Sequence, residues 1–390
     1  MKRLLFYGGT FDPPHSGHLH LLRQTIRRFH FDKIVVMPTA LPPHKQAAHY
    51  LSDEKRLRVL EMLFGHLRGV TVSSWELNKG GKSYSIETIT HLREQYPGYE
   101  IWFLMGSDMF LSFEKWYRAD ELAKMCTLVV APRNKEDVSL LEPMAKHLET
   151  TLNAKSVILQ IPIVERSSTQ IRQGQDDLML PLEVRYYLYG KEALESLESY
   201  LKENLSPEKY DHSYRVAEFA VGLAKIHGVD ENQVYLASLL HDATKCWGKS
   251  RQLAYLQKRH YKLSADDRQA PQIYHQITGS LFAAEKFRVC DRGILQAIKC
   301  HTTGRERMTE LDKILFLADS IEPARSYEGV EEMRQTAKVD LDKAVLMNFD
   351  RSIVYIVKKG FCLHPQTVAA RNWMLKSILM EGKFNDKKQS

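Results

Sequence analysis

The sequence predicts an α/β doubly wound parallel sheet followed by an all-α domain. In the first half, short and continuously apolar runs alternate with helical patterns, which is typical of strands buried on both faces of a parallel sheet. From about residue 205 onward, only helical periodicity remains. A chain of 390 residues also exceeds one ordinary hydrophobic core, so two domains are expected.

Six apolar runs supply the expected strands, at residues 4–7, 33–37, 70–75, 101–105, 127–131 and 157–159. Helical spacing follows the first run, Ser52 caps a second helix, and a third helix over 85–96 is halted by Pro97. In parallel sheets of this kind, ligands bind beyond the carboxyl ends of the strands. Four residues with suitable chemistry fall there: Gly8, Lys45, Asp108 and Arg133.

The expected domains are residues 1–192 and 205–382, joined by a linker over 193–204 and followed by a tail over 383–390. Around the linker the composition changes to Lys, Glu, Leu and Ser, and no strand pattern appears after it. The Ser206-Pro207 pair then starts the helical half, because serine caps a helix and proline suits its first position. The short polar tail is expected to fray.

Composition limits the classes of function that fit. The chain is 44% apolar and 26% charged, as in soluble globular proteins, and its formal charge of +7 suits polyanionic small molecules. No basic block indicates nucleic acid, no apolar run is long enough to span a membrane, and no signal peptide is recognisable. Five cysteines without C-x-x-C spacing indicate free thiols. We therefore expect a cytoplasmic protein without nucleic-acid or membrane partners, and a homo-oligomer is compatible with the sequence.

The first half is organised around residues 8–18, where an apolar run leads into two glycines and then a helix. Glycines let a backbone approach a phosphate closely, and a helix start supplies free N–H groups and a positive dipole end. His15 and His18 lie one turn apart, so both rings can face a group above that helix end. Two histidines in an ordinary loop are the alternative, but the strand, the glycine pair and the helix favour a phosphate site.

A second anion-binding pattern closes this half of the chain. Hydroxyls at Ser168 and Thr169 stand at a helix start, and Arg172 follows within a turn. Alone, such a pattern is also a plain helix cap. Earlier, a stiff double-proline turn presents Lys45, and Gly106 leads to Asp108 after an apolar run. These groups fit a polyphosphate.

Residues 1–190 resemble the nicotinate-mononucleotide adenylyltransferases of the H-x-G-H nucleotidylyltransferase superfamily, through Gly8 to His18, the turn at Lys45, Gly106 to Asp108, Trp116 and the closing motif. The resemblance implies a Rossmann-like domain that transfers AMP from ATP to nicotinate mononucleotide, with Mg²⁺ brought by ATP. By this resemblance, the catalytic residues are His15, His18, Lys45 and Arg172. The nucleotide-binding residues are Gly8, Gly9, Thr10, Phe11, Gly106, Asp108, Arg133, Ser168 and Thr169.

The same resemblance assigns a nicotinate site to Tyr84, Ser85, Trp116 and Tyr117. Trp116 would stack on the pyridine ring, although a core tryptophan is the alternative; its polar surroundings favour the stacking role. Ser85 stands where the family has threonine, and a contact through the backbone N–H tolerates that change.

The second half carries residues of metal-ligand type on its helices: His212, His241, Asp242, His275, His301 and Asp319. The apolar run 236–240 leads into Asp242, and the run 314–318 leads into Asp319. Carboxylates carried into a core need a cation partner. Histidines and carboxylates together suit a divalent ion, whereas a lone buried histidine is more often simply hydrogen-bonded.

The order of these residues resembles the HD-domain phosphohydrolases, and within them the bacterial symmetrical diadenosine tetraphosphate hydrolases. The stretches that carry the likeness are 211–217, 301–305 and 317–325. The resemblance implies two divalent metals, iron in that family, with Asp242 bridging them and His275 and His301 serving the second. Candidate polyphosphate contacts are Lys245, Arg305 and Arg325, which are equally compatible with plain surface charges.

Together, the two resemblances predict a bifunctional enzyme acting on ATP, nicotinate mononucleotide and diadenosine tetraphosphate. Three alternatives stay open. The first domain could use another acceptor, such as phosphopantetheine or nicotinamide mononucleotide. The second could hydrolyse a different phosphoanhydride or phosphodiester, or bind a nucleotide only to regulate the first. The sequence leaves open the metal, the oligomeric state and any communication between the sites.

Overall fold

The computed structural model describes residues 2–41, 50–162, 168, 171 and 180–386, and the side chains up to residue 380. The chain forms two compact units, Met1–Val184 and Arg185–Ser390. The division falls within α9 (Leu182–Tyr189). Each unit is described by itself.

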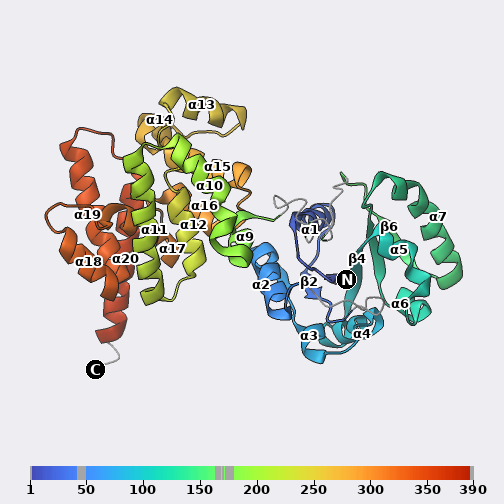
Figure 1. Ribbon diagram of the computed structural model, residues 1–390. Helices are drawn as coiled ribbons and strands as arrows, with labels where there is room; N and C mark the ends of the chain where they lie inside the picture. Colours follow the sequence, from blue (N-terminus) through green and yellow to red (C-terminus); the bar gives the residue numbers. More distant parts are fainter. Residues whose placement is uncertain (1, 42–49, 163–167, 169–170, 172–179, 387–390) are drawn as a thin grey trace. The chain divides into compact units, whose positions relative to one another are not determined.

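The first unit contains a parallel sheet of six strands in its described residues, in the order β3-β2-β1-β4-β5-β6. The strands are β1 (Lys2–Gly9), β2 (Lys33–Pro38), β3 (Val70–Val72), β4 (Tyr99–Gly106), β5 (Thr127–Ala131) and β6 (Lys155–Ile158). β1 is central and pairs with both β2 and β4, with Leu4 opposite Lys33 and Ile101. The order in which strands are added therefore reverses at β1: β2 and β3 extend the sheet on one side of it, and β4 to β6 extend it on the other. Helices flank both faces of the sheet (Figure 1). The predicted doubly wound class is confirmed.

The third strand is shorter than predicted. The apolar run 70–75 was expected to be extended throughout, but β3 ends at Val72 and Trp75 begins the short helix α3. The Ser73 hydroxyl accepts a hydrogen bond from the Trp75 backbone N–H at 3.3 Å, which turns the chain out of the sheet.

The remaining helical elements of the first unit are α1 (Ser16–Arg28), α2 (Asp53–Phe64), α3 (Trp75–Lys79), α4 (Ser85–Gln95), α5 (Ser107–Leu111), η1 (Phe113–Lys115), α6 (Ala119–Met125) and α7 (Lys135–Leu152). Ser52 caps α2 as predicted, accepting the Lys55 N–H. The central strands are apolar on both faces; Leu4, Leu5 and Phe6 of β1 are all buried. This is why the sequence shows continuous apolar runs rather than alternation.

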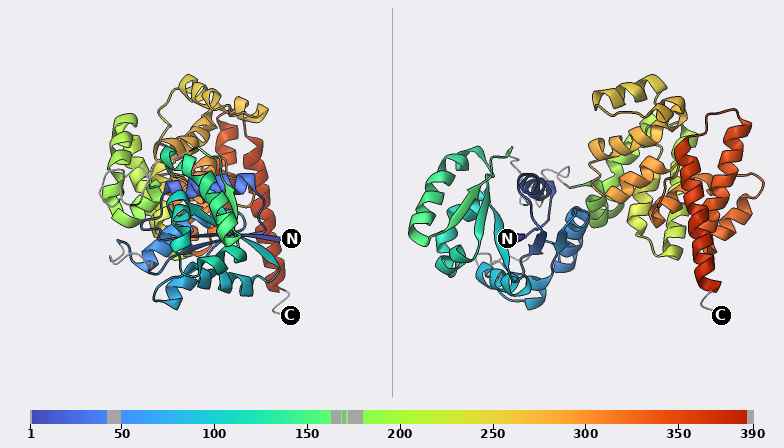
Figure 2. Two further views of the ribbon diagram at one scale, coloured as in Figure 1. Left: turned by 90° about the vertical axis from the view of Figure 1, so that its right-hand side faces the viewer. Right: turned by 180° about the vertical axis from the view of Figure 1, so that it is seen from behind.

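The second unit is all-helical over its described residues. Its elements are α9, η3 (Gly190–Leu194), α10 (Glu195–Asn204), α11 (Pro207–His227), α12 (Glu231–Leu240), α13 (Lys249–Lys258), α14 (Ala265–Gln269), η4 (Pro271–Ile273), α15 (Tyr274–Lys286), α16 (Arg292–Cys300), α17 (Glu310–Ile321), α18 (Val330–Val339), α19 (Leu341–Lys358) and α20 (Pro365–Asp386). α17 packs against α11, α12, α16 and α19, and α18 to α20 lie side by side (Figure 2).

The segments predicted as a linker and as a tail are helical, wholly or in part. Residues 193–204, expected as a linker, form the end of η3 and all of α10, and Leu197 and Leu201 are buried. The predicted tail begins at residue 383, whereas α20 continues to Asp386. Within the described part of the chain, no helix combines the length and the apolar character needed to cross a membrane.

A buried arginine supports the first loop of the sheet. Arg56 on α2 is fully buried, and its Nη1 donates to the carbonyl oxygens of Thr10 and Thr39, each at 2.7 Å. Its Nη2 donates to Asp53 at 2.6 Å. One guanidinium therefore holds together the segments that follow β1 and β2, both at the carboxyl edge of the sheet.

Replacing Arg56 by methionine is expected to lower the free energy of unfolding by about 3 kcal/mol or more, because Asp53 and two partly buried carbonyls lose their charged donor. Chemical denaturation of the full chain measures it. Arg58→Met is the matched control, since Arg58 lies on the same helix but is 44% exposed. An Arg56 variant as stable as the Arg58 variant would contradict the supporting role.

Candidate active sites

Glycines at the ends of β1 and β4 let other groups approach the backbone. A Cβ at Gly8 would lie 2.7 Å from a ring carbon of Phe6, and a Cβ at Gly106 would lie 2.5 Å from Nε of Arg133. At Gly8 the close atom belongs to a buried ring, whereas at Gly106 the half-exposed Arg133 side chain would have to move. β1 and β4 are neighbours at the reversal of strand order, where doubly wound sheets bind ligands.

Phe11 shapes the turn that follows. Its φ of 47° lies in the left-handed region that side chains other than glycine rarely adopt. Its ring is buried and packs edge-on against the ring of His18, with centroids 5.0 Å apart, and against Tyr7. The side chain of Phe11 therefore supports the turn, so any nucleotide contact would come from its backbone.

The two histidines of the turn cap α1. His15 is the N-cap residue, and its Nδ1 accepts the Gly17 N–H at 3.1 Å. Nδ1 of His18 accepts the His15 N–H, also at 3.1 Å. Because both Nδ1 atoms accept, a neutral ring carries its proton on Nε2. The centroids of the two rings lie 3.8 Å apart, so the pair presents two adjacent Nε2–H donors.

Burial and neighbouring charges keep the His18 ring neutral. Burial lowers the pKa of His18 well below its usual range, and His15 and Arg133 lower it further. A neutral imidazole can donate to a phosphate oxygen without releasing or taking up a proton.

Two of the predicted nucleotide-binding residues meet beyond β4 and β5. Arg133 Nη1 lies 2.9 Å from Asp108 Oδ2, with both side chains about half exposed. The Arg133 backbone N–H donates to the Ser107 hydroxyl at 3.0 Å. The ion pair thus lies at the carboxyl edge of the sheet, as predicted.

The motif at Ser168 contacts the motif that follows β1. The Ser168 hydroxyl donates to the carbonyl oxygen of Pro13 at 3.1 Å, a contact between residues 155 positions apart. The structure therefore joins the two predicted anion-binding motifs at Ser168. Lys45, Thr169 and Arg172 lie outside the described residues.

The predicted nicotinate residues lie around the start of α4. Tyr84 is the N-cap residue, Ser85 is the first helical residue, and the rings of Tyr84 and Tyr117 are 4.8 Å apart. Trp116 is half-buried and packs against Phe113 and another core phenylalanine. The tryptophan thus contacts the core and keeps part of its surface exposed, which is compatible with both predicted roles.

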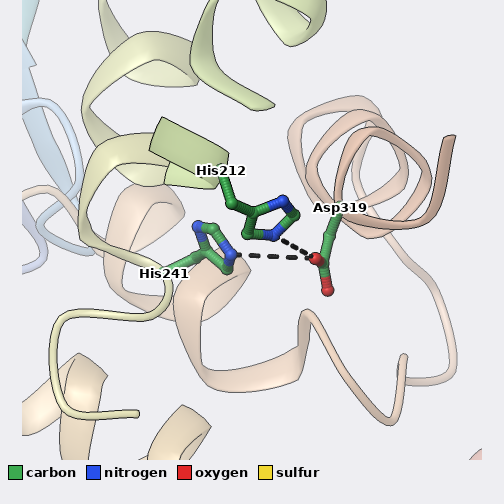
Figure 3. Close-up of side chains that lie close together, drawn as sticks. All are labelled: His212, His241 and Asp319. Carbon is green, nitrogen blue, oxygen red and sulfur yellow. Dashed lines mark hydrogen bonds and ion pairs between the residues drawn. The ribbon is translucent and has the colours of Figure 1, made fainter. Parts of the chain in front are cut away.

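All six predicted metal ligands converge in the second unit: His212 from α11, His241 and Asp242 after α12, His275 from α15, His301 after α16 and Asp319 from α17. In the first half of this centre, Nε2 of His212 lies 2.9 Å and Nε2 of His241 lies 3.8 Å from Oδ1 of Asp319 (Figure 3). The three atoms can share one ion.

Asp242 connects this half with the other. Its Oδ2 lies 3.6 Å from Nε2 of His241. Its Oδ1 lies 3.4 Å from Nε2 of His275 and 3.6 Å from Nε2 of His301. One carboxylate oxygen therefore faces each half, which is the arrangement of a bridging ligand.

Backbone carbonyls fix three of the four rings. Nδ1 of His241, His275 and His301 lies 2.6, 2.8 and 2.7 Å from the carbonyl oxygen three residues earlier. A carbonyl accepts only, so Nδ1 carries the proton and the Nε2 lone pair points into the centre. Nδ1 of His212 lies instead 3.2 Å from Oε1 of Glu322. All four rings are thus oriented for metal ligation.

The buried centre fits a cation. Among the described residues, Nε2 of His241 and Oδ1 of Asp242 are buried without a hydrogen-bond partner. Burial acts to raise the pKa of Asp242, but His241, Lys245 and the rings of His301 and His275 together outweigh burial and hold the pKa well below its usual range. The pKa of Asp319 is also lowered: burial acts to raise it, but the hydrogen bond with His212 and the neighbouring His241 and His301 together outweigh burial. Ionised carboxylates and directed lone pairs are what a divalent ion requires.

The sequence did not single out Glu322. Its carboxylate is 2% exposed, and besides His212 it accepts from Arg215 Nε at 3.0 Å and from the Ala324 N–H at 2.8 Å. Its position one turn after Asp319 is the only hint in the sequence, and the partner ring lies 110 residues away.

The three predicted polyphosphate contacts have different surroundings. Nζ of Lys245 lies 2.9 Å from Nε2 of His275, and Nη2 of Arg325 lies 3.4 Å from Oδ1 of Asp319. Arg305 instead donates from Nε to Asp312 at 2.9 Å, at the start of α17. The structure therefore brings Lys245 and Arg325 to the metal ligands, and pairs Arg305 with a helix cap.

Comparison with known proteins matches the two units to two families. Residues 6–174 match the Cytidylyltransferase-like family model, and residues 210–324 match the HD domain. A Mycoplasma genitalium protein named "Probable nicotinate-nucleotide adenylyltransferase/Ap4A hydrolase" is 28% identical over 89% of this chain and 96% of its own length.

Two relatives that match only one half of this chain have higher sequence identities to it. A Clostridium tetani "Probable nicotinate-nucleotide adenylyltransferase" is 32% identical over 50% of this chain and 99% of its own. A Halalkalibacterium halodurans "Bis(5'-nucleosyl)-tetraphosphatase, symmetrical" is 36% identical over 45% of this chain and 93% of its own.

Replacing Glu322 by glutamine is expected to weaken divalent-metal binding about 10- to 100-fold in the half of the centre that contains His212, because the ring loses its charged orienting partner. Titration of the metal-free chain with Mn²⁺ measures this. Glu331→Gln is the control, since Glu331 pairs with Arg334 and is 66% exposed. Equal affinities in the two variants would show that Glu322 does not orient His212.

Proposed function

Because the chain belongs to the nicotinate-nucleotide adenylyltransferase family in its first part and to the symmetrical bis(5'-nucleosyl)-tetraphosphatase family in its second, we propose that it is a bifunctional enzyme. The first unit transfers AMP from ATP to nicotinate mononucleotide, giving nicotinic acid adenine dinucleotide and pyrophosphate. The second hydrolyses diadenosine tetraphosphate to two ADP. The observation that carries the proposal is one chain that holds a pair of histidine donors at the sheet edge and a bridged histidine–carboxylate centre.

Adenylyl transfer needs no covalent intermediate with the protein. A phosphate oxygen of the acceptor attacks the α-phosphorus of ATP in line, and pyrophosphate leaves. His15 and His18 donate from Nε2 to the transferring phosphate, where charge accumulates in the transition state. Lys45 and Arg172 neutralise the polyphosphate, and Mg²⁺ arrives with ATP. The protein thus acts by positioning and by electrostatic stabilisation.

The other first-unit residues bind the two substrates. The nucleotide is held by Gly8, Gly9, Thr10, Phe11, Gly106, Asp108, Arg133, Ser168 and Thr169. The acceptor ring stacks on Trp116, whose partly exposed surface supports this role. Its carboxylate accepts backbone N–H groups near Tyr84, Ser85 and Tyr117, since the start of α4 offers unpaired N–H groups.

In the second unit, we assign one metal to His212, His241, Asp319 and Asp242, and the other to Asp242, His275 and His301, with iron as the proposed element. When bound, such a pair supplies a water activated for attack on a phosphoanhydride. Lys245 and Arg325, beside the two carboxylates, offset the charge of the phosphate chain. Arg305 would do so after leaving Asp312.

The two activities are proposed to reside in separate domains, residues 1–192 and 205–382, of a cytoplasmic protein. Each unit has its own buried core, such as Leu4 and Phe103 in the first and Leu239 and Leu315 in the second. Separate cores support separate function.

Replacing His18 by alanine is expected to slow adenylyl transfer about 100- to 1000-fold, because one preorganised donor to the transferring phosphate is lost. Steady-state turnover of ATP and nicotinate mononucleotide measures it, with circular dichroism to check folding. His30→Ala, at an exposed position after α1, is the control. A His18 variant within a few-fold of wild type would falsify the assignment.

Replacing Asp242 by alanine is expected to reduce bound metal and abolish hydrolysis of diadenosine tetraphosphate, since both halves of the centre lose a ligand. Adenylyl transfer should persist. Arg172→Ala should have the reverse effect on the two activities. Both activities are assayed on both full-length variants.

Two outcomes would contradict these assignments. If the folded Asp242 variant also stops transferring AMP, the units do not act separately. If it keeps both metal and hydrolysis, the hydrolytic centre is misassigned.

A further inference from the structure

Lys245 lies in the half of the metal centre formed by Asp242, His275 and His301. Its Nζ lies 2.9 Å from Nε2 of His275 and 3.5 Å from Oδ1 of Asp242. These two atoms are the ones assigned above to the second ion. The side chain is 34% exposed, so the ammonium sits where the centre meets solvent.

The ammonium makes the contacts that a metal ion would make. Nδ1 of His275 donates to the Gln272 carbonyl, so Nε2 offers its lone pair to the ammonium. The same Nε2 lies 3.1 Å from Nε2 of His301 and 3.2 Å from the Thr302 hydroxyl. A crowded nitrogen has no free direction left for a further ligand while the ammonium stays.

The other half has no such contact. Its cation, Arg325, lies 3.4 Å from Oδ1 of Asp319, and no cation among the described residues contacts a ring nitrogen of this half. Nε2 of His241 is buried without a hydrogen-bond partner among the described residues. The first half therefore keeps an open histidine nitrogen, whereas Nε2 of His275 in the second half is engaged by Lys245.

We propose that Lys245 is an internal competitor for the second metal ion. Its ammonium holds Asp242 and His275 together in the metal-free protein and moves out when that ion binds. The half with His212 consequently loads first and more tightly. This inference rests on the proposed two-metal centre, and it adds an order of loading that the two ligand sets alone do not specify.

Mn²⁺ titration of the metal-free full-length chain tests it, with free Mn²⁺ followed by electron paramagnetic resonance. Wild type is expected to show two dissociation constants at least about tenfold apart. Lys245→Met should tighten the weaker one about tenfold, because an ion no longer displaces an ammonium, and should leave the stronger one within about twofold. Lys249→Met removes a charge at an exposed position and is the control.

Thermal unfolding provides a readout independent of activity. Without metal, Lys245→Met should unfold a few degrees below wild type, because the buried Asp242 carboxylate loses a cation partner. Saturating Mn²⁺ should remove the difference. Lys245→Gln repeats both measurements with a second neutral side chain, in case methionine disturbs folding.

The outcomes separate the two levels of the proposal. Unchanged constants in both variants, or a second ion that binds more weakly in them, would overturn the competitor role while wild type still binds two ions. A wild-type chain that binds no Mn²⁺ would overturn the two-metal centre itself, and the competitor role with it.

Discussion

The second unit depends on the burial of one carboxylate. Asp242 is 5% exposed, and an ionised group at such depth is stable only with close partners of opposite charge or with hydrogen bonds. Its two oxygens face His241 on one side, and His275 and His301 on the other. Because these rings come from different helices, the helices have to pack so that all the rings meet at one carboxylate.

The packing of α17 meets this requirement. Its residues from Leu311 to Ala318 are all buried, so the helix is surrounded by others along most of its length. Asp319 and Glu322 then follow at the end of this apolar run, where the former joins the ligands and the latter orients His212. The apolar run fixes the depth of both carboxylates, and it is also the feature that makes Asp319 recognisable in the sequence.

Local patterns predicted the strands, and the order of histidines and carboxylates, with the resemblance to HD domains, predicted the six residues that meet in the second unit. Continuous apolar runs identify β1, β4 and β5 because both faces of these strands are buried. The same reasoning extended β3 to Trp75, since composition does not reveal that the Ser73 hydroxyl turns the chain. The linker was placed by a change of composition, which does not reveal that α10 forms there with Leu197 and Leu201 buried.

Long-range partners could not be predicted in this way. Glu322 meets His212 over 110 positions, and Ser168 meets Pro13 over 155. No periodicity within either segment specifies such a contact, which depends on how the elements pack. The contacts of Lys245 could be predicted only in part. Its separation from Asp242 by three residues is visible in the sequence, but its contact with His275 depends on how α15 packs beside the residues that follow α12.

In both sites a backbone group fixes the tautomer of the histidine rings, but that group is a donor in the first site and an acceptor in the second. In the first unit, backbone N–H groups donate to Nδ1 of His15 and His18, so a neutral ring carries Nε2–H and can donate to an anion. In the second unit, backbone carbonyls accept from Nδ1 of His241, His275 and His301, so Nε2 keeps its lone pair for a cation.

Helix ends supply the backbone partners of four of these five rings. His15 and His18 lie in the first turn of α1, where backbone N–H groups have no partner within the helix. His241 and His301 lie at the C-terminal ends of α12 and α16, where unpaired carbonyls point outward. His275 is the exception, because it lies in the first turn of α15 and its Nδ1 meets the Gln272 carbonyl of the preceding η4. The backbone group that meets Nδ1, an N–H or a carbonyl, therefore decides whether Nε2 can serve an anion or a cation, and the position in a helix alone does not.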